Sequence, residues 1–144
     1  AHAADIVLGT DWDVTLVLAD TTRQVKVTDA WLERVRRNGG TSGDFIFRIS
    51  RFYRDFYRST GVTDGFYNHD PTAMVYLVDH SLFATEKRAI RVVTEGITIG
   101  DVVAAKSVHY RTPGPWYGVP LANITTSVDS VGVMNVIEDT LTKR

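Results

Sequence analysis

The sequence has 144 residues, a formal net charge of −1, 44% hydrophobic residues and 23% charged residues. These values are ordinary for one globular domain with a real core. They exclude a strongly basic nucleic-acid-binding protein and give no electrostatic reason for membrane binding. The absence of cysteine excludes disulfides and zinc–thiolate sites, and no run has transmembrane length or a signal-peptide pattern. We therefore expect a cytoplasmic protein with neither nucleic acid nor a membrane among its partners.

The first segments predict a helix end, a strand and a second helix. Residues 1–9 are typical of a helix that ends at its final glycine. The apolar run at residues 14–18 indicates a buried strand of a parallel sheet, and Asp20 just after it either serves a site or caps the next turn. Residues 28–35 form a helix that Thr28 can cap. Because no N-cap precedes the first helix, we expect the chain to begin inside an element rather than at a domain boundary.

Residues 44–59 have the clearest helical pattern, and residues 38–43 before them are predicted to form a flexible glycine-rich break. Large apolar residues on one face of this helix predict a buried stripe. Arginines recur at three- and four-residue spacing, but acidic residues in the same helix favour a solvated face over RNA binding. The stripe comprises Phe45, Ile49, Phe52 and Phe56, and the arginines are Arg48, Arg51, Arg54 and Arg58.

Tyr53 and Tyr57 lie four residues apart on the same helix, beside the apolar stripe. Side chains at this spacing lie one above the other. They could form the wall of a pocket for a planar ring. The alternative is ordinary packing with the hydroxyl groups at the surface, and the sequence leaves both open.

The run Asn68-His69-Asp70-Pro71 combines a titratable ring, a carboxylate and a helix start. Asp70 is expected as the N-cap and Pro71 as the first helical residue. His69 would then lie just outside the helix N-terminus. Asp70 is either a cap alone or an oxygen ligand for a metal, with His69 as an acid beside it. The helix is predicted to bury one apolar stripe, formed by Ala73, Met74, Leu77 and Val78.

The rest of the chain alternates strands with a helix. Residues 89–93 and 122–126 are predicted strands, and residues 98–101 form a turn. A last helix begins after Ser127 or Asp129, with Val133, Val136, Ile137 and Leu141 in the core. The alternation predicts an α/β fold with a mainly parallel sheet and flanking helices.

In this order the segments resemble the C-terminal half of the inosine-uridine preferring nucleoside hydrolases. Residues 69–73, His-Asp-Pro-Thr-Ala, and residues 79–83, Asp-His-Ser-Leu-Phe, are similar to the family's His-Asp-Pro-Leu-Ala and Asp-Pro-x-Leu-Phe motifs. Four other segments match family motifs in order, namely residues 3–7, 14–22, 92–100 and 123–141. The resemblance covers nearly the whole chain and implies a single portion, residues 1–144, of a nucleoside-hydrolase-like domain.

The resemblance also implies roles for individual residues. Asp70 would bind the family's catalytic Ca²⁺, and His69 would be the acid that assists departure of the base. Tyr53 and Tyr57 would lie near the base and bind the substrate. The implied activity is hydrolysis of the N-glycosidic bond of ribonucleosides to free base and ribose, with a small-molecule nucleoside as partner.

The chain departs from the family's pattern in several places. It lacks the Asp-x-Asp-x-x-x-Asp-Asp loop that supplies most calcium ligands, the Asn-rich segment that holds the ribose, and the Asp-Pro before the Glu-Ala-Ala run. His2, His80 and Ile99 stand where the family has Glu, Pro and Arg. One carboxylate at Asp70 cannot complete a Ca²⁺ site, which takes six to eight oxygen ligands.

Two hypotheses follow from the sequence. In the first, the chain is part of a Ca²⁺-dependent nucleoside hydrolase whose other ligands lie in a longer protein or a partner chain. In the second, it is a non-catalytic nucleoside-binding or assembly module. Either way, a half-domain leaves a sheet edge and an apolar face uncovered, so we expect self-association or pairing with a missing N-terminal half.

Overall fold

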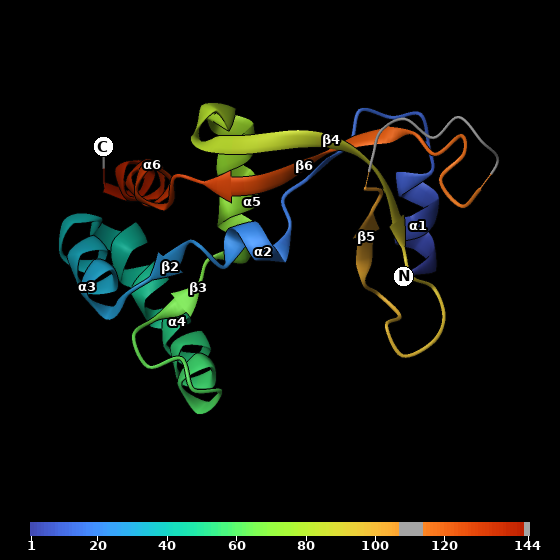
Figure 1. The fold of residues 1–144 in the computed structure, drawn as a ribbon. Coiled ribbons are helices and arrows are strands. Elements are labelled where there is room, and N and C mark those ends of the chain that lie inside the picture. The colour runs from blue at the N-terminus through green and yellow to red at the C-terminus, as the bar shows by residue number, and fades with distance from the viewer. Residues whose placement is uncertain (107–113, 143–144) are drawn as a thin grey trace. The chain divides into compact units, whose positions relative to one another are not determined.

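The structure, a computed structural model, describes residues 1–106 and 114–142 (Figure 1). The chain divides into two compact units: unit 1 is Ala1–Leu16 with Thr85–Thr125, and unit 2 is Val17–Ala84 with Thr126–Arg144. In chain order the elements are α1 (His2–Leu8), β1 (Thr15–Leu16), α2 (Ala19–Thr22), β2 (Lys26–Val27), α3 (Asp29–Asn38), α4 (Gly40–Ser59), β3 (Phe66–Tyr67), α5 (His69–Val78), the 3₁₀ turn η1 (His80–Leu82), β4 (Phe83–Val92), β5 (Val102–Ala104), β6 (Leu121–Val128) and α6 (Ser130–Thr142).

A four-stranded sheet has the order β1-β6-β4-β5. β1 is parallel to β6, with Thr15 opposite Asn123, whereas β4 and β5 are antiparallel, with Ile90 opposite Ala104. The predicted α/β fold is therefore confirmed, and its sheet is mixed. Antiparallel pairing follows from the short connection between β4 and β5, which a turn can close but a parallel crossover cannot. The run at residues 14–18 pairs over only two residues and is half-buried, so the buried strand predicted there is shorter and more accessible.

In unit 1, α1 is attached to β4 by one carboxylate. Asp5 accepts hydrogen bonds from the Arg91 guanidinium, with Nε–Oδ1 and Nη2–Oδ2 distances of 2.8 and 2.6 Å, and from the Val92 amide at 2.9 Å. These bonds, first those from Arg91, lower the pKa of Asp5 to about 2. The helix ends where predicted, with Gly9 as its cap in a right-handed rather than a left-handed conformation.

The core of unit 2 joins α3 and the two-stranded antiparallel sheet of β2 and β3 to α6. Val27, Trp31, Val35 and Phe66 are buried together, and Met134 of α6 packs against them. Thr28 caps α3, as predicted, by accepting a hydrogen bond from the Trp31 amide at 3.2 Å. The predicted last helix also forms. It is α6, which Asp129 caps, and its Val133 is fully buried.

The predicted flexible break at residues 38–43 does not form, because α4 begins at Gly40 and only Gly39 separates it from α3. Gly40 takes the positive φ of 56° that the sharp turn requires. Gly43 lies against α3, where a Cβ atom would be 2.1 Å from the Val35 carbonyl oxygen. The glycines here allow a close helix contact instead of flexibility.

The predicted orientation of α4 is wrong, because its apolar stripe is exposed. Phe52 is 82% exposed and Phe45 is 52% exposed. The buried residues are Gly43, Ser50 and Arg54. Gly43 lies against α3, and Ile46, Phe47 and Tyr57 pack against the core of the unit. The predicted stripe of Phe45, Ile49, Phe52 and Phe56 lies on a different side of the helix.

The start of α5 also differs from the prediction. Asn68 is the N-cap, so His69 and Asp70 lie in the first helical turn and Pro71 is the third helical residue. Pro is tolerated there because the first amide groups of a helix have no intrahelical partner. The buried residues are Thr72 and Val75, whereas the predicted stripe is largely exposed at Met74, Leu77 and Val78.

Within residues 1–106 and 114–142, no helix combines the length and the apolar character that crossing a membrane requires.

Candidate active site

Both ring nitrogens of His69 have hydrogen-bond partners in unit 2. The Thr22 hydroxyl of α2 lies 2.6 Å from Nδ1, and the Tyr57 hydroxyl of α4 lies 3.1 Å from Nε2. The ring is half-buried at the N-terminus of α5. Two helices that are distant in sequence, α2 and α4, thus hold the ring of His69, which belongs to α5.

The direction of the hydrogen bond between Thr22 and His69 depends on the tautomer of the ring. The Thr22 hydroxyl lies 2.6 Å from Nδ1 and 3.3 Å from the Ala19 carbonyl oxygen, so it can accept from Nδ1 while it donates to Ala19. In the tautomer with its proton on Nδ1, Nε2 accepts the Tyr57 hydroxyl proton. When the ring is protonated, Nε2 becomes a donor towards the phenol oxygen.

Aromatic rings surround the Tyr57 side of this contact. Tyr53 and Tyr57 pack edge to face with their ring centroids 5.0 Å apart, and Tyr67 packs against Tyr57 at 5.5 Å. Tyr67 also lies 6.0 Å from the His69 ring. Burial, and then a hydrogen bond with Tyr53, raise the pKa of Tyr57 above its ordinary value. The phenol therefore stays protonated at neutral pH and can donate.

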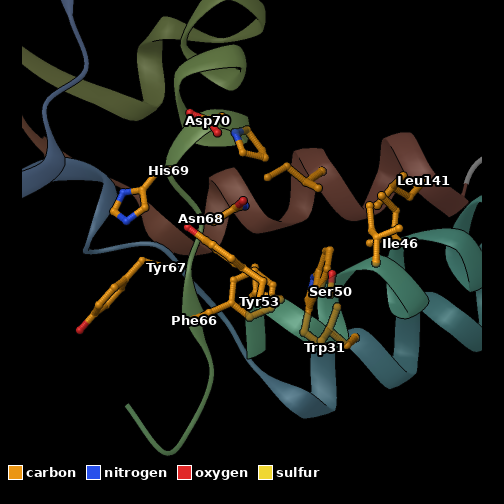
Figure 2. A pocket seen from close by; sticks show the side chains of 15 residues that line it. Trp31, Ile46, Ser50, Tyr53, Phe66, Tyr67, Asn68, His69, Asp70 and Leu141 are labelled. Carbon is orange, nitrogen blue, oxygen red and sulfur yellow. The ribbon is translucent and has the colours of Figure 1, made fainter. Parts of the chain in front are cut away.

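A cavity of about 410 Å³ lies beside these residues, between α3, α4, α6 and the start of α5. Its lining is mainly apolar and includes Trp31, Ile46 and Tyr53, while Ser50 and Asn68 are its buried polar side chains. Figure 2 shows the His69 ring on the other side of the chain from the Asn68 carboxamide. Tyr53, His69 and Asp70 all line this cavity, and Tyr57 contacts the His69 ring.

Asp70 alone does not fit a calcium site. Its side chain is exposed in the first turn of α5. In the described part of the chain, no group of three or more His, Asp or Glu side chains could hold a metal ion. Ca²⁺ requires six to eight oxygen ligands, so further ligands would have to come from elsewhere.

The residues that differ from the family's pattern lie in both units. In unit 1, His2 is on α1 and Ile99 is 57% exposed in the loop between β4 and β5. In unit 2, His80 lies in η1, and its ring is 6.5 Å from that of Tyr76. Asp20, the carboxylate that the sequence predicted either to serve a site or to cap a turn, is also in unit 2. It is exposed on α2 and pairs with Arg23 at 3.9 Å.

The sequence did not predict Thr22 or Arg54 as parts of this site. Thr22 lies just beyond the carboxyl end of the predicted strand at residues 14–18. Ligands of α/β sheets bind beyond such strand ends, so this position was the signal that could have pointed to Thr22. Arg54 was grouped with a solvated stripe, but it is 5% exposed and paired with Asp29. No spacing rule separates it from its exposed neighbours on the helix.

Comparison with known proteins identifies the family. A family model described as inosine-uridine preferring nucleoside hydrolase matches residues 1–135. Uridine nucleosidase 1 of Arabidopsis thaliana is 30% identical over 143 residues, which are 99% of this chain and 43% of that protein. The inosine-uridine preferring nucleoside hydrolase of Leishmania major is 35% identical over 115 residues, covering 79% of this chain and 35% of that protein.

Solved structures agree with this family assignment. The plant nucleoside hydrolase PpNRh1 superposes with a TM-score of 0.93 at 31% identity, over 99% of this chain and 45% of that one. A purine-preferring ribonucleoside hydrolase from Gardnerella vaginalis gives 0.81 at 26% identity, over 97% of this chain and 43% of that one. The chain thus spans less than half the length of these relatives. The resemblance found in its motifs is confirmed, and the chain belongs to the inosine-uridine preferring nucleoside hydrolase family.

Proposed function

We propose that this chain is part of a ribonucleoside hydrolase, an enzyme that cleaves the N-glycosidic bond and releases free base and ribose. The observation that carries the proposal is the His69 ring, held at both nitrogens by Thr22 and Tyr57 in a chain of this family. The relatives' names state action on uridine and inosine, which makes these two nucleosides the first substrates to test.

The reaction needs a proton at the leaving base. Water forms a bond to C1′ of the ribose and gives up one proton, the C1′–N bond breaks, and the electron pair of that bond goes to the base. A donor near that nitrogen, or near another base atom that shares the charge, stabilises the departing group. A histidine supplies such a proton near neutral pH.

We assign this donor role to His69, with Tyr57 as its partner. In the protonated ring Nε2 donates towards the Tyr57 oxygen, and the phenol can pass its own proton on to a bound base. Thr22 accepts from Nδ1 and fixes the ring's orientation. Tyr53 and Tyr57 together provide aromatic surfaces for the base, the role expected for them from the sequence.

Asp70 is proposed as one ligand of the family's Ca²⁺. Because the described residues do not complete such a site, the proposal needs further oxygen ligands from a longer protein or a partner chain. The need for these further ligands also supports the expectation that the chain self-associates or pairs with an N-terminal half. No step of the chemistry assigned above uses the metal.

The alternative is a non-catalytic module that binds a nucleoside or serves assembly. The isolated position of Asp70 favours it, because nothing in the described part of the chain gathers carboxylates around that residue. Such a module would keep the aromatic surfaces and bind nucleosides without cleaving them.

The test is hydrolysis of uridine and inosine by the complete product of the gene, with added Ca²⁺ and with a chelator. We expect chelator-sensitive release of base that falls at least about 100-fold in His69→Ala, because general acid catalysis contributes roughly 10²–10⁴-fold. His80→Ala is the matched control, since His80 is an exposed histidine on the turn after α5.

Three other results would separate the hypotheses. Equal loss in His69→Ala and His80→Ala would contradict the assigned role of His69. Calorimetric binding of uridine without release of uracil would favour the binding module. Neither binding nor release would contradict both functions.

A further inference from the structure

Arg54 is a buried cation in unit 2, and the side chain of its partner Asp29 is 58% exposed. Arg54 itself is 5% exposed, although it belongs to a helix whose Arg48, Arg51 and Arg58 are all exposed. A buried guanidinium is strongly unfavourable unless its charge and its N–H groups have partners. The partners of Arg54 therefore show what the residue holds in place.

The guanidinium joins three segments of the chain. Its Nε and Nη2 atoms donate to the Asp29 carboxylate, at 2.6 and 2.9 Å, in the bidentate geometry of strong ion pairs. Nη2 also donates to the Thr63 carbonyl oxygen at 2.6 Å, and Nη1 donates to that of Val62 at 3.3 Å. Arg54 thus ties α4 to the first residue of α3 and to the loop that follows α4.

Both of these connections lead to His69. The loop at residues 60–65 continues into β3, and His69 follows β3 after Asn68. Asp29 comes two residues after β2, which pairs with β3 through Val27 and Phe66. The guanidinium therefore connects α4 to the two-stranded β2–β3 sheet, and the chain leads from β3 to His69.

Tyr57 lies on α4, three residues after Arg54. Its carbonyl oxygen accepts a hydrogen bond from the Val62 amide at 3.0 Å, so the same loop is attached at both residues. Its phenol reaches His69 Nε2 at 3.1 Å. A hydrogen bond of this length breaks when the two groups separate by about 0.5 Å.

We propose that Arg54 is a positioning residue, which sets the distance between α4 and the two-stranded β2–β3 sheet and so holds the Tyr57 phenol against the His69 ring. The proposal deepens the function proposed above and rests on it for its catalytic meaning. The geometric part stands independently of activity. Lys cannot replace Arg54, because one ammonium cannot form the bidentate pair and also reach both carbonyl oxygens.

The first test compares Arg54→Lys with Arg48→Lys as a matched control. Arg48 is exposed on the same helix and pairs with Asp44 at 3.3 Å. The readouts are the nuclear Overhauser effect between the Tyr57 and His69 rings and the Tyr57 pKa, both measured by NMR with ring-labelled protein. We expect Arg54→Lys to lose the ring-to-ring effect and to return the Tyr57 pKa towards its ordinary 10.0, whereas Arg48→Lys changes neither.

A folded Arg54→Lys variant that keeps both signals would overturn the proposal. If this variant does not fold, Asp29→Asn decides, because its amide still accepts one hydrogen bond but the ionic pair is lost. A weakened ring-to-ring effect in folded Asp29→Asn supports positioning, and an unchanged one overturns it. None of these measurements requires nucleoside hydrolysis, so failure of the proposed function would appear separately.

Discussion

At the scale of single residues, one carboxylate attaches α1 to β4 in unit 1. The Asp5 side chain is 14% exposed, and its bonds to Arg91 and Val92 favour the charged form. The pKa of Asp5 is therefore lower in the folded state than the ordinary 3.8 expected in the unfolded chain. A lowered carboxyl pKa stabilises the folded state above the unfolded pKa, and this contribution disappears as the pH falls through the folded pKa.

We predict that Asp5→Asn removes a part of the pH dependence of stability. In the wild type, about 1 to 2 kcal/mol of unfolding free energy should be lost between about pH 4 and pH 2, given that Arg91 is partly exposed. Urea unfolding monitored by circular dichroism at several pH values measures it. Asp11→Asn, an exposed carboxylate of the same unit, is the control. Equal pH profiles for wild type and Asp5→Asn would contradict the prediction.

The candidate site shows how far residue patterns predict chemistry. His69, Tyr53 and Tyr57 could be selected from the sequence because a short motif and a four-residue spacing marked them. Thr22 lies 47 positions before the ring that it contacts, and Arg54 reaches Asp29 across 25 positions. Such contacts arise only when helices pack, and local spacing does not encode them.

At the scale of elements, α3 and α4 approach each other through Gly43. A Cβ atom there would meet the Val35 carbonyl oxygen at 2.1 Å, and backbone atoms cannot move aside as a flexible side chain can. Alanine has the higher helix propensity, by about 1 kcal/mol, but the overlap requires the two helices to separate.

We therefore predict that Gly43→Ala lowers the unfolding free energy by about 1 to 3 kcal/mol, despite the gain in helix propensity. Gly9→Ala is the control, because its Cβ would make ordinary 3.4 Å contacts and its φ of −85° suits any residue. It should change stability by less than about 0.5 kcal/mol. Chemical denaturation of both variants measures the difference. An unchanged unfolding free energy in Gly43→Ala would contradict the prediction, because it would mean that α3 and α4 leave room for a Cβ atom at residue 43.

The contact between α3 and Gly43 of α4 explains why the orientation of α4 could not be predicted. The period of Phe45, Ile49, Phe52 and Phe56 correctly indicates a helix with these residues on one face. Periodicity tells which residues share a face, but it does not tell which neighbour covers that face. In unit 2, Gly43 lies against α3 and the buried Arg54 pairs with Asp29 at the start of α3, so the side of α4 that packs is not its most hydrophobic side.

At the scale of the whole molecule, several faces expose large apolar side chains. On α4, Phe52 and Phe56 are 82% and 53% exposed, and on α5, Leu77 and Val78 are both 75% exposed. Contiguous apolar surfaces of this kind favour association in water. The element order could be predicted from the order of the motifs, whereas the division into two units depends on contacts between distant segments.

We predict that the isolated chain self-associates. Sedimentation velocity at about 10 to 100 µM should show species larger than a monomer, because burial of these side chains removes apolar surface from water. Phe52→Ser combined with Phe56→Ser should shift the distribution towards the monomer. Val131→Ser, a single exposed apolar residue of α6, should not. A strictly monomeric wild type over this range would contradict the prediction.

The interleaved order of the two units has a consequence for building smaller proteins. Unit 1 takes its segments from the start and the middle of the chain, so no single cut releases either unit intact. His69, Tyr57, Thr22 and Arg54 all belong to unit 2. The Thr126 hydroxyl donates to the Ala84 carbonyl oxygen at 3.3 Å, so the two chain ends left by excising residues 85–125 are neighbours. A gene that joins residue 84 to residue 126 through a short turn would therefore encode the whole candidate site on one continuous, shortened polypeptide.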